Sequence, residues 1–182
     1  MPSANYLPSV WIGCLAAYNQ GILHGDWVVV GDGMNVIEDQ IQRILAESPV
    51  EDSEEWFLGD TDNLPYMGEF PSLEKMDDVG EFIKMNSDIY PPAVLLKVLE
   101  FTAIDLELAN ELIEECMGIY PNFREFSDSI ADEIVFSELP NCYRNNSVLT
   151  QYFDYESFAN DLAHDYHVID VPGGVFIVHS SV

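Results

Sequence analysis

The sequence predicts an α+β protein, and three observations support that class. Near each end of the chain, two apolar, β-branched segments are separated by a turn signal, which is typical of β-hairpins. Between these ends, the apolar residues recur with the three-to-four-residue period of amphipathic helices. The chain has 182 residues, which is enough for one domain of ordinary size or for two to three small ones.

The first region is predicted to be a hairpin followed by a helix and a return strand. Val10–Tyr18 and Leu23–Val30 are the two apolar segments of the hairpin. Asn35 can cap the helix that follows, within which isoleucines recur at helical spacing. Glu55–Gly59 can supply a short third strand. Together these elements form a predicted N-terminal α+β domain, residues 1–69.

The middle of the chain, residues 70–116, is predicted to be a helical domain. Ser72 is suited to cap its first helix, and Pro92 can open the second because proline is tolerated in a first turn. A third helix is expected from Asp105, with apolar residues on one side and Cys116 at the end of that stripe. The opposite side carries glutamates and no cation: Glu107, Glu111, Glu114 and Glu115.

The last region, residues 117–182, is predicted to be a C-terminal α+β domain. Phe123–Ile134 and Asp154–His164 have the apolar periodicity of helices. Val168–Val171 and Val175–His179 are short apolar segments joined by a glycine turn, so they predict a terminal hairpin.

The most unusual property of the chain is its charge. Asp and Glu number 33 against 6 Lys and Arg, which gives a formal net charge of -27. Because 48% of the residues are hydrophobic, this acidity is not that of a disordered tail. So few cations cannot pair the carboxylates, and most of these must build a negative surface field. Such a field repels nucleic acid, membranes and acidic metabolites, and it attracts basic proteins.

No catalytic or cofactor-binding signature is present. Gly31–Gly33 lacks the third glycine of a dinucleotide fingerprint, and no phosphate-binding or nucleophile-elbow motif occurs. The acidic cluster Asp60–Asn63 lacks the glycine and glutamate of a calcium loop. His164 and His167 could be drawn as metal ligands, but a histidine near a helix end is also explained by the helix dipole. We therefore predict no enzyme, no cofactor and no metal; metal bound to the native protein would revive the enzyme alternative.

The compartment indicated by the sequence is the cytoplasm. Cys14, Cys116 and Cys142 are odd in number and lack metal-ligand spacing, so reduced thiols are expected. The first residues have neither the cationic segment nor the apolar core of a signal peptide. No apolar run approaches the ~18 residues that a membrane span requires.

The acidic helix faces suggest imitation of a DNA backbone. Duplex DNA carries one charge per ~1.7 Å, so 27 net charges correspond to roughly 46 Å of duplex. Carboxylates four residues apart on a helix are ~6 Å apart along its axis, which is of the order of the separation of neighbouring phosphates. Ten carboxylates are expected to form the phosphate-like set: Asp77, Asp78, Glu81, Glu107, Glu111, Glu114, Glu115, Glu125, Asp128 and Asp132.

Three stretches of the chain form a recognisable set: Val10–Gly21 with Leu23–Gly25 and Trp27, then Glu54–Trp56 through Gly68–Leu73, and then Tyr152–Leu162 followed by Gly173–Phe176. In this order they resemble the ArdA-type antirestriction proteins. Each stretch is weakly specific alone. Together with the acidity they form a strong resemblance.

The resemblance implies an elongated, dimeric DNA mimic, carried by mobile elements, that binds type I restriction–modification enzymes and blocks their access to DNA. It implies three small domains, with a helical middle domain and dimerisation through the C-terminal one. The antirestriction motif should fall at residues 136–155, where the candidate residues are Phe136, Leu139, Val148, Leu149, Tyr152, Phe153 and Tyr155.

The sequence leaves one alternative open. An acidic interaction protein could instead sequester another basic DNA-binding protein of the nucleoid type, and the charge alone does not separate the two hypotheses. In either case Trp11, Tyr18 and Trp27 are expected to serve packing within the protein rather than contact with the partner.

Overall fold

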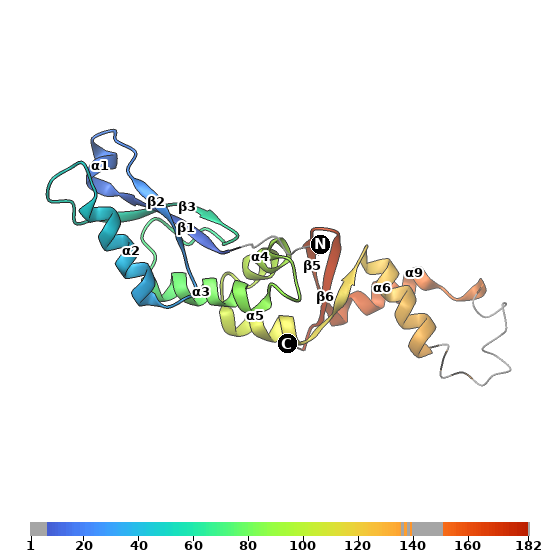
Figure 1. Ribbon diagram of the computed structural model, residues 1–182. Helices are drawn as coiled ribbons and strands as arrows, with labels where there is room; N and C mark the ends of the chain where they lie inside the picture. The colour runs from blue at the N-terminus through green and yellow to red at the C-terminus, as the bar shows by residue number, and fades with distance from the viewer. Residues whose placement is uncertain (1–6, 136, 138, 140–150, 182) are drawn as a thin grey trace, which may run out of the picture. The chain divides into compact units, whose positions relative to one another are not determined.

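Two compact units make up the computed structural model of the chain (Figure 1). The residues that it describes are 7–135, 137, 139 and 151–181. The N-terminal unit extends to Leu106 and the C-terminal unit begins at Glu107. Each unit contains helices and an antiparallel three-stranded sheet, so the α+β class is confirmed. The division into three domains, with a boundary near residue 70, stays a prediction.

The N-terminal unit is built on a sheet with the strand order β2-β1-β3. In chain order its elements are β1 (Ser9–Cys14), α1 (Leu15–Asn19), β2 (Gly25–Val29), α2 (Met34–Ala46), β3 (Trp56–Asp62), α3 (Leu73–Asn86) and α4 (Pro92–Phe101). The predicted hairpin is confirmed as the antiparallel β1–β2 pair, in which Trp11 lies opposite Trp27. The predicted return strand is confirmed as β3, which pairs antiparallel with β1.

Helix α2 covers one face of this sheet (Figure 1). On that face the strand residues Val10, Ile12 and Val28 are buried. The helix contributes Ile37 and Ile41, which are also buried. Alternation along the strands therefore directs every second residue to the core and leaves the others on the opposite face.

Two local predictions in this unit were wrong. Leu15–Asn19 forms the short helix α1 instead of continuing the first strand. Asn35 does not cap α2; Gly33 stands at the cap position, with a φ of 112° and no capping side chain. A glycine is suited to this position because its backbone φ lies in a region that other residues rarely adopt.

The helical part of the N-terminal unit begins as predicted. The Ser72 hydroxyl accepts a hydrogen bond from the Lys75 backbone N–H at 3.1 Å and caps α3. Pro92 occupies the first turn of α4. The apolar sides of both helices are buried, with Met76 on α3 and Leu95 on α4 fully enclosed.

Helix α4 ends in a Schellman motif that lacks its usual glycine. The Ile104 N–H donates to the Leu99 carbonyl at 2.8 Å, and the Ala103 N–H donates to that of Glu100 at 3.2 Å. Ala103 has a φ of 52° and Ile104 a φ of 64°. The left-handed region costs a non-glycine residue roughly 1–2 kcal/mol. The end of α4 is therefore strained.

Ala103→Gly is expected to raise the free energy of unfolding by about 0.5–1 kcal/mol. The glycine removes the backbone strain and loses part of the gain to the greater entropy of the unfolded chain. Urea denaturation of the purified protein measures the change. Ala93→Gly, on an exposed position within the same helix, is the control and is expected to lower stability. Equal effects of the two glycines would contradict this interpretation of the α4 terminus.

The C-terminal unit is built on a second sheet, with the strand order β4-β6-β5. The elements that follow α4 are α5 (Leu106–Glu114), β4 (Cys116–Tyr120), α6 (Phe123–Ile130), the π-helix η1 (Ala131–Val135), α9 (Tyr155–Leu162), the 3-10 helix η2 (Ala163–Asp165), β5 (Tyr166–Val171) and β6 (Gly174–His179). The predicted terminal hairpin is confirmed as β5–β6. Phe126 of α6 packs with Val175 and Ile177 of β6 in the core of this unit.

The region around Cys116 differs from the prediction. We expected it to end the apolar stripe of the third central helix, but α5 ends at Glu114 and Cys116 opens strand β4. Strand β4 pairs antiparallel with the distant strand β6, and its Tyr120 has Val175 as register partner. Local periodicity cannot reveal a strand whose hydrogen-bond partner is so distant, and it therefore extended the helix too far.

Candidate partner-binding surface

Four of the six Lys and Arg residues form ion pairs with carboxylates of the same chain. The pairs are Arg43–Asp26 at 3.0 Å, Lys84–Asp32 at 2.7 Å, Lys97–Glu100 at 2.6 Å and Arg124–Asp128 at 2.7 Å. Three of the pairs are exposed on both sides, and exposed pairs add little stability. Their main consequence is that the remaining surface is almost uniformly negative.

Seven of the ten predicted phosphate-like carboxylates are exposed and form no ion pair with a cation that the structure describes. They are Asp78 and Glu81 on α3, Glu107, Glu111 and Glu114 on α5, Glu115 directly after it, and Glu125 on α6. The other three, Asp77, Asp128 and Asp132, make specific contacts within the protein.

The glutamates of α5 form the most regular part of this set. Ala109 and Leu112 are buried on one side of the helix, and all four glutamates predicted for the other side are exposed. Like charges three or four residues apart on a helix disfavour it by ~0.2–0.5 kcal/mol per pair. Glu114 and Glu115 also lie at the C-terminal end, where the helix dipole disfavours negative charge and where the last turn has no basic residue. This arrangement of glutamates lowers the stability of the helix. A surface that only had to keep the protein well solvated would not need it.

Asp77 has a different environment from its neighbour Asp78. Its Oδ1 accepts hydrogen bonds from the backbone N–H groups of Gly31 at 3.0 Å and Gly33 at 2.9 Å. Asp77 is half-buried and Asp78 is exposed. The Asp77 carboxylate therefore holds the loop that precedes α2 against α3, a role that the sequence analysis missed. The one available signal was a Gly-Asp-Gly segment before a helix, whose N–H groups need an acceptor.

Asp128 and Asp132 belong to a network between α6, η1 and α9. The Arg124 guanidinium pairs with Asp128 and lies 5.7 Å from the centre of the Tyr155 ring. The Tyr155 hydroxyl donates to Asp132 across 3.4 Å. Burial raises the pKa of the Tyr155 phenol, and the nearby charge of Asp132 raises it further. The phenol therefore stays protonated as a hydrogen-bond donor.

The predicted antirestriction-motif region is only partly described by the structure. Phe136, Val148 and Leu149 lie outside the described residues. Leu139 is half-buried, whereas Tyr152 is 80% exposed. The half-buried Phe153 ring packs against the rings of Tyr155 and Phe158, with centroid separations of 4.7 Å and 5.4 Å. The large exposed ring of Tyr152 is available to a partner.

Asp154 caps the helix that follows this region. Its carboxylate accepts hydrogen bonds from the Ser157 backbone N–H at 3.0 Å and from the Ser157 hydroxyl at 2.8 Å. These hydrogen bonds lower the pKa of the Asp154 carboxyl. The stability that this cap contributes is therefore present above the unfolded pKa, and it is lost as the pH falls through the lowered folded pKa.

Comparison with known protein families identifies the chain. A family model described as antirestriction protein (ArdA) matches residues 10–177. The chain belongs to the ArdA antirestriction family. The match extends from β1 to β6 and so includes both sheets. A search of curated proteins found no match.

Membership confirms the resemblance seen in the sequence. ArdA proteins are antirestriction inhibitors that interact with restriction enzymes, and they are not an enzyme family. Among the residues that the structure describes, no helix has the length and hydrophobicity needed to span a membrane.

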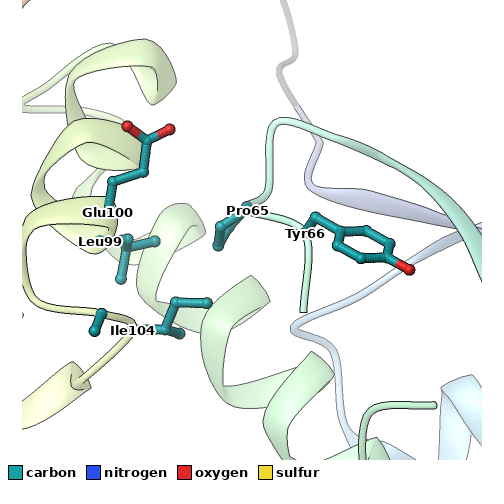
Figure 2. A pocket seen from close by; sticks show the side chains of 6 residues that line it. Pro65, Tyr66, Leu99, Glu100 and Ile104 are labelled. Carbon is teal, nitrogen blue, oxygen red and sulfur yellow. The ribbon is translucent and has the colours of Figure 1, made fainter. Parts of the chain in front are cut away.

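A hollow in the described part of this ArdA chain lacks a convergent set of catalytic groups. Figure 2 shows this hollow in the N-terminal unit, lined by Pro65, Tyr66, Leu99, Glu100, Ala103 and Ile104. The Tyr66 and Glu100 side chains point in different directions, and Glu100 is paired with Lys97. Within the described part of the chain, no group of three or more His, Cys, Asp and Glu side chains is placed to hold a metal ion.

The expectation about the aromatic residues holds only in part. Trp11 is half-buried, as packing within the sheet requires. Trp27 is 47% exposed and Tyr18 is 58% exposed. These two rings of the ArdA chain therefore belong to its surface as well as to its packing.

Proposed function

We propose that the protein is an acidic mimic of double-stranded DNA that occupies the DNA-binding groove of a type I restriction–modification enzyme and inhibits it by competition. Family membership supports an antirestriction role. The observation that carries the proposal of DNA mimicry is the row of exposed glutamates along α5. None of these glutamates forms an ion pair with a cation that the structure describes. A groove that binds phosphates would attract such a row.

The proposed binding mode follows from the physics of DNA binding. A DNA-binding groove gains affinity by exchanging small ions for phosphate charges, and the same exchange is open to carboxylates. A folded mimic avoids the cost of bending or unwinding a duplex. Individual exposed acids in a screened surface are each worth little, so the effect should be collective.

We further propose that the protein acts in the cytoplasm as a homodimer, with residues 117–182 and the region around Tyr152 and Phe153 at the dimer interface. The exposed ring of Tyr152 supports this placement. Sedimentation velocity of the purified protein should show a particle of two chains. Tyr152→Ala should shift it toward one chain.

Competition with DNA tests the proposed function. The purified protein should displace a labelled duplex from a type I methyltransferase core at low salt. Its affinity should fall on the order of 10³-fold between about 50 and 200 mM salt, as expected when six or more charges are matched. A salt-independent interaction would contradict the proposal, and so would capture of nucleoid-type proteins without any competition at the core.

A further inference from the structure

The sheet of the N-terminal unit has a second face, opposite α2, that carries a row of aromatic side chains. Trp11 and Trp27 are register partners on β1 and β2, so their side chains lie on the same face. Phe57 of β3 is the register partner of Gly13 on β1 and joins them on that face. The Tyr18 ring, from α1, lies 5.0 Å from the Phe57 ring. We call these four residues the aromatic row.

Three glycines lie directly beneath the Trp11 ring, which is the central ring of this row. A Cβ atom built on Gly13, Gly25 or Gly59 would lie 2.6 Å from an atom of the Trp11 indole. The indole therefore rests directly on the backbone of all three strands, where no larger residue fits beside it. The Phe57 ring packs edge to face against the Trp11 ring, with 5.8 Å between the ring centroids. The Trp11 ring at the centre of the row is therefore held in place by the backbone itself.

Two rings of the row, those of Trp27 and Tyr18, are open to solvent, whereas Trp11 is half-buried and Phe57 is buried. Trp27 is 47% exposed and Tyr18 is 58% exposed. The opposite face of the same sheet is buried under α2, with Val10 and Ile12 fully enclosed. Exposed tryptophan and tyrosine rings are typical anchors of protein interfaces.

Two carboxylates lie on the same face as the row. Asp60 is the register partner of Trp11, and Asp62 is that of Ser9. Both are exposed, and neither pairs with a cation that the structure describes. Asp26, by contrast, is the register partner of the buried Ile12 and pairs with Arg43 of α2. The open face therefore combines aromatic surfaces with uncompensated negative charge.

We propose that this face is a docking site for arginine side chains of the protein partner. A guanidinium group can stack on an indole face and at the same time donate hydrogen bonds to a carboxylate. Lysine suits the site less well, because its ammonium is compact and more strongly hydrated. This inference rests on the proposed function, since a groove built for phosphates presents such arginines. It adds a contact that duplex phosphates do not offer.

The same charges disfavour other occupants of this face. A symmetric contact between two copies would bring the aspartates of both chains together, because a two-fold interface joins the same patch from each. Nucleic acid would be repelled by the acidic surface as a whole.

The first test is the affinity of Trp27 variants of the full-length protein for a type I methyltransferase core. Trp27→Leu keeps apolar bulk but removes the aromatic face, and it should weaken binding about three- to thirtyfold. The loss should be similar at low and high salt, with the salt slope unchanged. Trp27→Phe keeps a ring and should lose less. Met85→Ala is the matched control, because Met85 is exposed on α3 and lies outside the row.

The second test does not need the enzyme. Indole fluorescence of the protein is titrated with hexa-arginine and with hexa-lysine at about 0.15 M salt, where surface attraction is partly screened. Hexa-arginine should bind several-fold more tightly to the parent, and this preference should be lost in Trp27→Leu and reduced in Asp60→Asn/Asp62→Asn.

The outcomes separate the two proposals. Suppose that the parent protein competes with DNA at the methyltransferase core and that Trp27→Leu binds the core with the same affinity as Met85→Ala. This result overturns the arginine site and leaves DNA mimicry intact. Parent protein that never competes contradicts DNA mimicry, and the peptide titration still decides the arginine site. Equal binding of the two peptides overturns it. A change of oligomeric state in Trp27→Leu would also overturn it, because the face would then join two copies of the chain.

Discussion

Replacing Glu107, Glu111, Glu114 and Glu115 together with glutamine is expected to weaken binding to a methyltransferase core on the order of 10- to 100-fold near 0.15 M salt. These four carboxylates are exposed and close together on and beside α5. The slope of log affinity against log salt should become shallower by about two to four, because fewer phosphate-like charges meet the groove. Titration at several salt concentrations measures both quantities.

The same variant should be more stable than the parent. It removes like-charge repulsion between neighbouring turns and two negative charges at the C-terminal end of the helix. The free energy of unfolding should rise by about 1 kcal/mol, measurable by urea denaturation. A variant with a higher free energy of unfolding and a lower affinity for the methyltransferase core would indicate that these charges serve recognition.

The matched control removes the same number of charges from an irregular part of the chain. Glu47→Gln/Glu51→Gln/Asp52→Asn/Glu54→Gln neutralises four exposed acids between α2 and β3. If recognition requires an ordered row, this control should lose several-fold less affinity than the α5 variant. Equal losses would mean that only net charge matters, and the assignment of α5 to the phosphate-like set would then be wrong.

Asp77→Ala is expected to lower the free energy of unfolding by about 2–4 kcal/mol, because the charged acceptor of two backbone N–H groups is removed. The loop at Gly31 and Gly33 would lose its attachment to α3. Asp78→Ala, at the adjacent exposed position, should change stability by less than about 0.5 kcal/mol. Thermal or urea unfolding of both variants measures the difference.

The conservative variant refines this second prediction. Asp77→Asn retains an oxygen that can accept both hydrogen bonds but lacks the charge, so its loss should be about half that of the alanine variant. Two unstable variants with weakened inhibition would show only that the fold is needed. A stable Asp77→Ala with strongly reduced affinity would instead return Asp77 to the phosphate-like set.

Much of the fold was predictable from local patterns. The hairpins at both ends follow from apolar segments separated by turns, and the Ser72 cap and Pro92 start follow from the chemistry of a helix N-terminus. Two of the failures share a cause. Strand β4 at Cys116 and the cap at Gly33 each depend on partners far along the chain, namely β6 and Asp77. The spacing of residues within one segment does not predict partners that are distant in the sequence.

The sequence by itself determined that the protein is an acidic, α+β member of the ArdA family, because charge, periodicity and family stretches are local and additive properties. It could not separate Asp77 from Asp78, which differ only in what lies opposite them. The tertiary structure decided that one carboxylate holds a loop and the other faces solvent. It also decided that Trp27 lies on an open face, because exposure and hydrogen bonding depend on which distant segments the fold brings together.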